Sequence, residues 1–229
     1  MNTYIEGNLK EVHKRIEEAC ARRGRSPEEI TLIAVSKTKP LEDLKEAYRC
    51  GERTFGENKV QEIIAKAPDM PEDVRFHMIG HLQRNKVRQV IPHTALIHSV
   101  DSLRLAKQIQ EDAAREGRTV DILLEVNVAR EESKFGFFAE EVEDAVREIC
   151  QFPNVRIRGL MTIAPFVEDP EENRAIFRKL NELSVDIARK NIDNVIMGVL
   201  SMGMTGDYEV AIEEGATMIR VGTGIFGAR

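Results

Sequence analysis

Two lysines follow the first apolar run of the chain. Lys37 and Lys39 lie in the segment 35–40, VSKTKP, at the end of this run. If the run is an extended strand, Lys37 projects to the same side as Ile33 and Val35. A lysine partly shielded from water and close to other cations is less stable as an ammonium, which makes it a nucleophile toward carbonyl groups. The segment predicts a Schiff-base lysine at Lys37, with a lysine that merely extends into solvent as the alternative. Lys39, beside a proline, is expected in solvent.

Two short segments near the end of the chain combine glycines with hydroxyl side chains. The first runs from Ser201 to Asp207 (SMGMTGD), before a helix expected to start near Tyr208, and the second runs from Arg220 to Gly227 (RVGTGIFG). Glycines let backbone N–H groups approach an anion, and hydroxyls add donors. The two segments together predict a phosphate-binding cup, with ordinary turn glycines as the alternative. The second also matches GxGxxG, but only two residues follow it, so we expect no βαβ unit and no dinucleotide site.

The histidines do not predict a metal site. His77 and His81 flank Met78-Ile79-Gly80, but the segment has the pattern of a strand followed by a turn. No carboxylate falls between them, as the helical HExxH zinc motif requires. We also find no GxSxG nucleophile elbow and no Cys/His pairing that predicts a nucleophile. No metal is therefore expected.

The elements that position these residues are predicted by alternating apolar runs and segments of helical period, the pattern of βα units around a parallel sheet. Eight runs have the character of strands, the number that closes a (β/α)8 TIM barrel, in which phosphate is usually held by the loops after strands seven and eight. The two glycine segments follow the last two of these runs. The eight are TLIAVS from Thr31, RTFGE from Arg53, RFHMIG from Arg75, ALIHSV from Ala95, VDILLEVNV from Val120, VRIRGLMTI from Val155, NVIMGVLS from Asn194 and TMIRVG from Thr217.

An apolar stripe precedes the first strand and predicts an extra N-terminal helix that covers one face or end of the barrel. Its members are Ile5, Leu9, Val12, Ile16 and Cys20. We expect one domain over residues 1–229, with 1–30 as the helix and lead-in and 31–229 as the barrel. A doubly wound open sheet is the alternative, because the alternation alone does not show whether the sheet closes.

Composition limits the partners. The chain has 229 residues, is 42% hydrophobic and carries a formal net charge of −6, which argues against nucleic-acid binding, since phosphate neutralisation needs a basic face. Its apolar runs are too short to cross a bilayer, and its first residues lack a signal peptide's apolar stretch. Three widely spaced cysteines suit a reducing compartment. We expect a cytoplasmic protein with no membrane partner.

Seven blocks of the sequence resemble the YggS/PROSC family of pyridoxal phosphate homeostasis proteins, in the right order and over nearly the whole chain. This resemblance implies a barrel similar to the N-terminal barrel of alanine racemases, monomeric or weakly associating, with bound pyridoxal 5′-phosphate. The blocks are AVSKTKP from Ala34, FGENKVQE from Phe55, HMIGHLQRNK from His77, SKFGF from Ser133, GLMTI from Gly159, SMGMTGDYEVAI from Ser201 and RVGTGIFG from Arg220.

The family pattern also implies a role for individual residues. It places the Schiff base on Lys37, the pyridine nitrogen near Arg220 and the phosphate on the ends of the last two strands. The remaining implied contacts are Asn58, His77 and Met161 around the ring, and Ser201, Met202, Gly222 and Thr223 at the phosphate. Lys59 and Gly224 depart from the family's usual residues, an aromatic side chain and alanine.

Three functions remain open at this point. The first is a non-catalytic carrier that takes up pyridoxal phosphate reversibly and hands it to apo-enzymes that require it. An arginine at the pyridine nitrogen makes the ring a poor electron sink, and we expect no C-terminal β-domain like that of barrel-type racemases after Arg229. The second is an amino-acid racemase of the alanine racemase type. The third is a sugar-phosphate isomerase or lyase, in which Lys37 attacks a substrate carbonyl.

Overall fold

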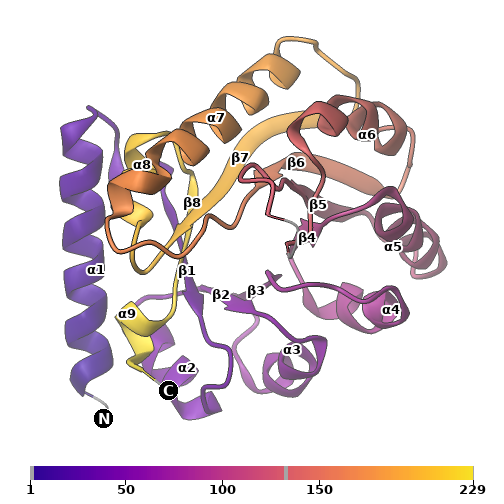
Figure 1. Ribbon diagram of the computed structural model, residues 1–229. Coiled ribbons are helices and arrows are strands. Elements are labelled where there is room, and N and C mark those ends of the chain that lie inside the picture. The colour runs from indigo at the N-terminus through magenta and orange to yellow at the C-terminus, as the bar shows by residue number, and fades with distance from the viewer. Residues whose placement is uncertain (1–2, 132–133, 229) are drawn as a thin grey trace.

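Eight parallel strands close into a barrel in this computed structural model, which describes residues 3–131 and 134–228. Each strand pairs with the next along the chain, and the last pairs with the first (Figure 1). The predicted (β/α)8 barrel is confirmed, and the open sheet is wrong. The strands are β1 (Thr31–Val35), β2 (Thr54–Glu57), β3 (Arg75–Met78), β4 (Leu96–Val100), β5 (Val120–Glu125), β6 (Val155–Met161), β7 (Val195–Met204) and β8 (Met218–Val221).

Helices surround this barrel (Figure 1). The strands are buried on both faces, as parallel strands usually are. In β1, Leu32 and Ala34 belong to the large core cluster shared with the helices. Ile33, between them, lies beside Gly56 of β2. The helices are α1 (Thr3–Arg22), α2 (Leu41–Arg49), α3 (Val60–Lys66), α4 (Val87–Val90), α5 (Leu103–Arg115), α6 (Val142–Ile149), α7 (Arg174–Ala188), α8 (Tyr208–Glu213) and α9 (Thr223–Phe226). No helix in the described part is long and apolar enough to span a bilayer.

The extra N-terminal helix is confirmed. α1 runs along one side of the barrel and packs against α2, α8 and α9 (Figure 1). Its predicted apolar stripe is buried from Ile5 to Cys20. Polar contacts at the edge of α1 also join it to α8 and α9. Arg22 pairs with Glu213 at 2.6 Å, and Asn8 donates to the carbonyl of Ile225 at 2.9 Å. The last contact ties α1 to the segment after β8.

The strand before the first glycine segment is longer than predicted. β7 was predicted to end at Ser201 but continues to Met204, so three further residues are strand and the turn is confined to residues 205–207. The register with β8 shifts between Ser201 and Met204. Gly203, with φ of 89°, is in the left-handed region that favours glycine. This local irregularity lets the strand extend further, and the next helix then begins at Tyr208 as predicted.

An apolar cluster fills part of the barrel and supports the polar residues there. Leu96, Leu123 and Met161 are fully or almost fully buried and contact one another, with Val199 and Met218 packed against them. These residues come from five different strands. They form a dry layer, so polar groups beside it must find their hydrogen bonds within the protein.

Candidate functional site

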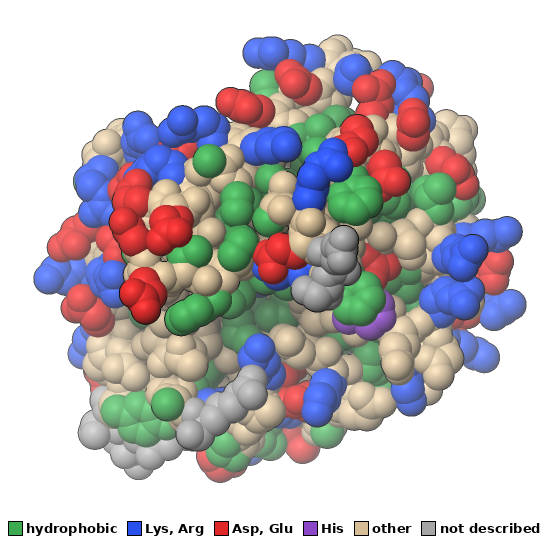
Figure 2. Space-filling view, in the orientation of Figure 1, with side chains coloured by type: hydrophobic (Ala, Val, Ile, Leu, Met, Phe, Trp, Pro, Cys, Tyr) green, Lys and Arg blue, Asp and Glu red, His purple; other side chains and the backbone are tan. Residues whose placement is uncertain are grey.

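The carboxyl ends of β1 and β8 bring Lys37 next to the second glycine segment. Lys37 is half-buried and follows Ser36, which is completely buried. The two strands pair directly, and a Cβ added to Gly222 would lie 3.3 Å from the carbonyl oxygen of Val35. A side chain would therefore crowd this junction, and glycine lets the two backbones approach. Figure 2 shows a face of the molecule with a recess near its centre, hydrophobic side chains inside it and charges of both signs around it.

The backbone before Lys37 is fixed by a buried ion pair. Ser36 donates from Oγ to Glu57 at 2.7 Å, and Lys66 donates from Nζ both to the Ser36 carbonyl at 2.9 Å and to Glu57 at 2.7 Å. Burial raises the pKa of the Glu57 carboxyl to about 7, although Lys66 and Ser36 donate to it. This clamp holds the residue next to the candidate nucleophile.

The backbone after Lys37 is fixed as well. Thr38 has a φ of 64° and donates its N–H to Glu62 at 2.7 Å. Lys66 also pairs with Glu62, at 3.0 Å, so one cation organises both sides of Lys37. This clamp was not predicted from the sequence. The one hint of it in the sequence is that Glu62 and Lys66 are four residues apart on a helix, a spacing typical of ordinary surface pairs.

Lys39 is not the solvated lysine that its position beside a proline predicted. Its ammonium donates to the carbonyl oxygens of Phe226, Gly227 and Ala228 at 2.8, 3.2 and 3.2 Å. These carbonyls belong to the last residue of α9 and to the two residues after it, and a cation is the favoured group at the carboxyl end of a helix. Lys39 thus connects the segment after β1 to the segment after β8.

The two glycine segments meet, as the barrel pattern predicted. Thr205 lies in the turn after β7, and its Oγ1 accepts hydrogen bonds from the N–H groups of Gly222 at 3.3 Å and Gly224 at 3.4 Å. Thr223, between them, is exposed. Both bonds are long for N–H···O contacts, so these amides are weakly engaged donors. Thr205 lies in the first predicted segment, but its role as the hydroxyl nearest these amides was missed.

Arg220 and Ser201, two predicted site residues, are in direct contact inside the barrel. The guanidinium donates to Ser201 Oγ at 2.6 Å and to the carbonyl oxygen of Thr162 at 2.9 Å. Ser201 is 0% exposed. Burial lowers the pKa of Arg220 to about 10, which leaves it a cation at neutral pH. The Ser201 hydroxyl thus binds Arg220 here, while Thr205 occupies the place beside the glycine amides.

Two histidines extend this contact across the barrel. His98 Nδ1 lies 2.9 Å from Ser201 Oγ, and His98 Nε2 lies 2.9 Å from Nδ1 of His77. Burial lowers the pKa of His77 to about 4 and, with His77 and Arg220 nearby, holds the pKa of His98 well below its usual range. Both rings are therefore neutral. His77 was predicted as a site residue; His98 was missed, although it alternates with the inward-facing Leu96.

The other predicted ring and phosphate contacts divide into two groups. Met161 is buried inside the barrel, and Asn58 is half-buried after β2, where its carbonyl would lie 2.5 Å from a Cβ on Gly80. Met202 lies in the core cluster shared with the helices. Because neighbours on a strand point to opposite faces, its side chain points away from that of Ser201. The structure therefore does not place the Met202 side chain at the predicted phosphate site.

Glu125 is a carboxylate that sequence analysis did not identify. It ends β5, pairs in register with Met161 and lies two residues after Leu123, both in the barrel cluster. It is 7% exposed. Burial, reinforced by Asp101 and opposed by Arg220, raises its pKa to about 7. It is a group that can gain or lose a proton near neutral pH.

His77 and His81, which are four residues apart in the sequence, do not come together. His77 lies in the barrel, whereas His81 stacks on the exposed ring of Phe135 at 3.8 Å between centroids and pairs with Asp101 at 3.0 Å.

Ser133, the first residue of one family-like block, lies outside the described residues.

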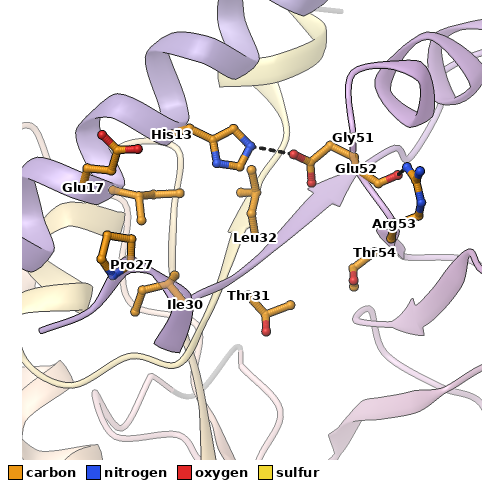
Figure 3. Close-up of a pocket in the computed structure, with 11 residues that line it drawn as sticks. His13, Glu17, Pro27, Ile30, Thr31, Leu32, Gly51, Glu52, Arg53 and Thr54 are labelled. Carbon is orange, nitrogen blue, oxygen red and sulfur yellow. Dashed lines mark hydrogen bonds and ion pairs between the residues drawn. The ribbon is translucent and has the colours of Figure 1, made fainter.

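A separate hollow lies at the amino ends of β1 and β2, against α1 (Figure 3). His13 and Glu52 are hydrogen-bonded at 2.7 Å beside it. No lysine is among its described lining residues, so it offers no amine for a Schiff base.

Known proteins resemble this chain over almost its whole length. The family model described as alanine racemase, N-terminal domain, matches residues 8–229. A pyridoxal phosphate homeostasis protein of Aquifex aeolicus is 45% identical and covers 96% of each chain. A protein of that name from Escherichia coli K12 is 40% identical and covers 98% of this chain and 97% of its own. The chain belongs to the pyridoxal phosphate homeostasis protein family.

Solved structures similar to this member of the pyridoxal phosphate homeostasis family share its barrel. PipY of Synechococcus elongatus PCC7942, with pyridoxal phosphate bound, is 38% identical, with a TM-score of 0.81 over 93% of this chain and 100% of that one. An unknown protein from Bifidobacterium adolescentis is 36% identical with a TM-score of 0.94, covering 98% of this chain and 95% of that one. Alanine racemase of Clostridium difficile, 15% identical with a TM-score of 0.78, shares the fold alone. The family predicted from the sequence blocks is confirmed.

Proposed function

We propose that this chain binds pyridoxal 5′-phosphate at the carboxyl ends of the strands and serves in its homeostasis. The cofactor is held as a Schiff base on Lys37, with its phosphate on Thr205 and the amides of Gly222 to Gly224. Arg220 then serves the pyridine nitrogen. The names of the homeostasis relatives and the cofactor bound to PipY support this proposal.

One observation carries the proposal: Lys37 and the weakly engaged amides follow two strands that pair with each other. Lys37 lies just after β1, and Gly222 directly follows the adjacent β8, with its backbone against Val35. The donor set suits an aldehyde bearing a phosphate, because it combines a primary amine, weakly engaged N–H donors and a buried cation on neighbouring strands. Asn58, His77 and Met161 are the proposed neighbours of the ring, and Ser201 supports Arg220. Thr223 contributes its N–H, and Met202 at most its backbone.

We assign the chain the role of carrier rather than catalyst. Bound pyridoxal phosphate supplies an electron sink for carbanion chemistry, and its strength depends on the group that faces the pyridine nitrogen. Arg220 is a cation at neutral pH that holds its proton more tightly than that nitrogen would, whereas a carboxylate would keep the nitrogen protonated. His77 and His98 are neutral, so they add no second charge. This environment favours holding the aldehyde over activating a substrate.

The same role defines the proposed surroundings of the protein. The recipients are apo-enzymes that require pyridoxal phosphate, and the protein works in the cytoplasm as a monomer formed by one cofactor-binding domain, residues 1–229. Nucleic acids and membranes are not among its partners. The composition, the net charge of −6 and the family support this role.

Glu125 favours a second candidate function, amino-acid racemisation. A buried carboxyl with a pKa of about 7 has the acid–base strength that proton transfer at neutral pH requires. If it acts in this way, the protein loaded with pyridoxal phosphate exchanges the α-hydrogen of an amino acid with deuterated water, and Glu125→Gln abolishes the exchange.

One experiment separates these functions. The protein is loaded with pyridoxal phosphate, and release is followed by absorbance on dialysis, while proton NMR follows α-hydrogen exchange of added alanine in deuterated buffer. The carrier proposal predicts slow, complete release and no exchange above the free cofactor. Exchange at an enzymatic rate that depends on Glu125 contradicts the carrier assignment. Failure to take up any cofactor contradicts the whole proposal.

A further inference from the structure

The buried hydrogen bonds from Arg220 to His77 form one continuous chain across the barrel. The chain passes from β8 to β7, β4 and β3, and the His98–Ser201 contact joins β4 and β7, two strands that do not pair with each other. Ser201 and His98 are 0% exposed, and His77 and Arg220 are each 4% exposed. Water therefore has little access to the middle of the chain, and each proton must be placed by the protein groups themselves.

Donor and acceptor accounting allows one complete arrangement of protons. Arg220 can only donate, so Ser201 Oγ accepts from it. The Ser201 hydroxyl proton then needs an acceptor, and within the described residues His98 Nδ1 is the acceptor in contact with it. His98 therefore has its own proton on Nε2. That proton is donated to Nδ1 of His77, so His77 has its proton on Nε2.

The opposite arrangement is incomplete. If His77 Nδ1 and His98 Nδ1 were the protonated nitrogens, Ser201 Oγ would accept from both His98 and Arg220. Its hydroxyl proton would then be buried with no acceptor in the part of the chain that is described. A buried polar group without its hydrogen bond is strongly disfavoured. The arrangement that starts at Ser201 is the one the geometry selects.

We propose that this chain is a one-directional relay that makes His77 a hydrogen-bond donor, through Nε2–H, toward an anionic oxygen of the ligand in the barrel. The proposal rests on the proposed function, which supplies pyridoxal phosphate as the ligand. Nε2 of His77 makes no hydrogen bond with a described residue and is not among the fully buried side-chain atoms that lack a partner there, so it retains access to solvent or ligand.

The relay transmits polarisation from Arg220 to His77 without transferring a proton. A cation that donates to Ser201 Oγ polarises the hydroxyl, and each following bond polarises the next. His77 becomes a stronger donor while it stays neutral. His98 is a positioning residue in this scheme, because it acts on the ligand only through its neighbours.

The experiment is ¹⁵N NMR on protein labelled at its five histidines, assigned by single substitutions, between pH 6 and pH 8. Nitrogen shifts distinguish protonated from unprotonated ring nitrogens. The relay predicts Nδ1 unprotonated and Nε2 protonated in both His77 and His98. It also predicts that Ser201→Ala, which deletes the hydroxyl that donates to His98, allows both tautomers of the two histidines to be populated. Circular dichroism checks that this variant folds. A protonated Nδ1 in either ring, or unchanged tautomers in folded Ser201→Ala, overturns the relay.

Added pyridoxal phosphate tests the ligand half and separates it from the proposed function. The relay predicts that the His77 Nε2–H proton shifts downfield on binding, and that His98→Asn, which retains an amide donor and acceptor, preserves more of this shift than His98→Leu. If the cofactor labels Lys37 but this proton does not move, the relay is wrong and the cofactor proposal stands. If the cofactor does not bind at all, the proposed function and the ligand half fail together, while the tautomers still decide the direction of the relay.

Discussion

Lys66 donates a hydrogen bond of 2.9 Å to the carbonyl oxygen of Ser36, the residue immediately before Lys37. The same ammonium neutralises Glu57, which is 0% exposed and has one oxygen, Oε2, without a hydrogen-bond partner in the described part. The clamp thus combines two tasks. It compensates a buried carboxylate, and it holds the backbone from which the candidate Schiff-base lysine extends.

Removing this cation should destabilise the fold. We expect Lys66→Met to lower the free energy of unfolding at pH 8 by about 3 kcal/mol, because it leaves Glu57 buried and unpaired. Denaturant unfolding measures the change. Lys45→Met is the matched control, since Lys45 pairs with the exposed Glu42, and it should cost about 0.5 kcal/mol or less. Equal losses in the two variants would contradict the clamp.

A second substitution should relieve part of that loss. Adding Glu57→Gln to Lys66→Met removes the uncompensated charge, so the double variant should be more stable at pH 8 than Lys66→Met alone. At pH 5 the advantage should shrink, because the raised pKa of Glu57, about 7, leaves it mostly protonated there. If the double variant is no more stable than Lys66→Met at either pH, the buried charge of Glu57 is not the cause of the stability loss.

Glu125 should make stability depend on pH in a defined direction. Its pKa rises from an ordinary 4.5 to about 7 on folding, so between these values the native state binds more protons than the unfolded state. Its contribution to stability therefore falls as pH rises through this window. Glu125→Gln should equal the wild type near pH 4 and be more stable by about 3 kcal/mol at pH 8. A pH-independent difference between the two unfolding curves would refute this.

The threonine beside the glycine amides should matter for phosphate and little for the ring. We expect Thr205→Val to weaken binding of pyridoxal phosphate about tenfold, the effect of losing one hydrogen bond to a charged group. Binding of pyridoxal, which lacks the phosphate, should change little. Absorbance titration of both ligands measures this. A similar loss for the two ligands would mean that Thr205 supports the fold instead of the phosphate.

Two glycines provide a matched test of the barrel geometry. Gly159 of β6 has a φ of 153°, and a Cβ there would lie 1.8 Å from the carbonyl oxygen of Val199. Gly159→Ala should therefore destabilise the fold by about 4 kcal/mol or more. Gly7 is exposed on α1 with nothing within 4 Å, so Gly7→Ala should stabilise by about 0.5–1 kcal/mol. Thermal unfolding of both variants measures these changes in stability. A Gly159→Ala variant as stable as the wild type would refute the close approach of β6 and β7.

Much of the barrel could be predicted because each βα unit carries its own local pattern. The eight apolar runs locate all eight strands within about two residues at their starts, and the segments around Gly222 and Thr205 follow strands whose ends must meet. The extension of β7 to Met204 was missed, since a glycine there has the appearance of a loop. Its left-handed φ and the register shift are tertiary features.

The polar interior was harder to predict for a different reason. Ser201 and His98 are 103 residues apart, on strands that do not pair, so no spacing in the sequence relates them. Glu125 resembles any acidic residue at a strand end, and its raised pKa depends on burial beside Met161. Lys39 was wrongly expected in solvent because its acceptors are carbonyls at the carboxyl end of α9, at the other end of the chain.

The most direct test of the central claim is borohydride reduction of protein loaded with pyridoxal phosphate, followed by peptide mapping by mass spectrometry. The account predicts one dominant pyridoxyl label, on Lys37, which disappears in Lys37→Ala without moving to Lys39. A dominant label on any other lysine, or undiminished labelling of folded Lys37→Ala, would contradict it.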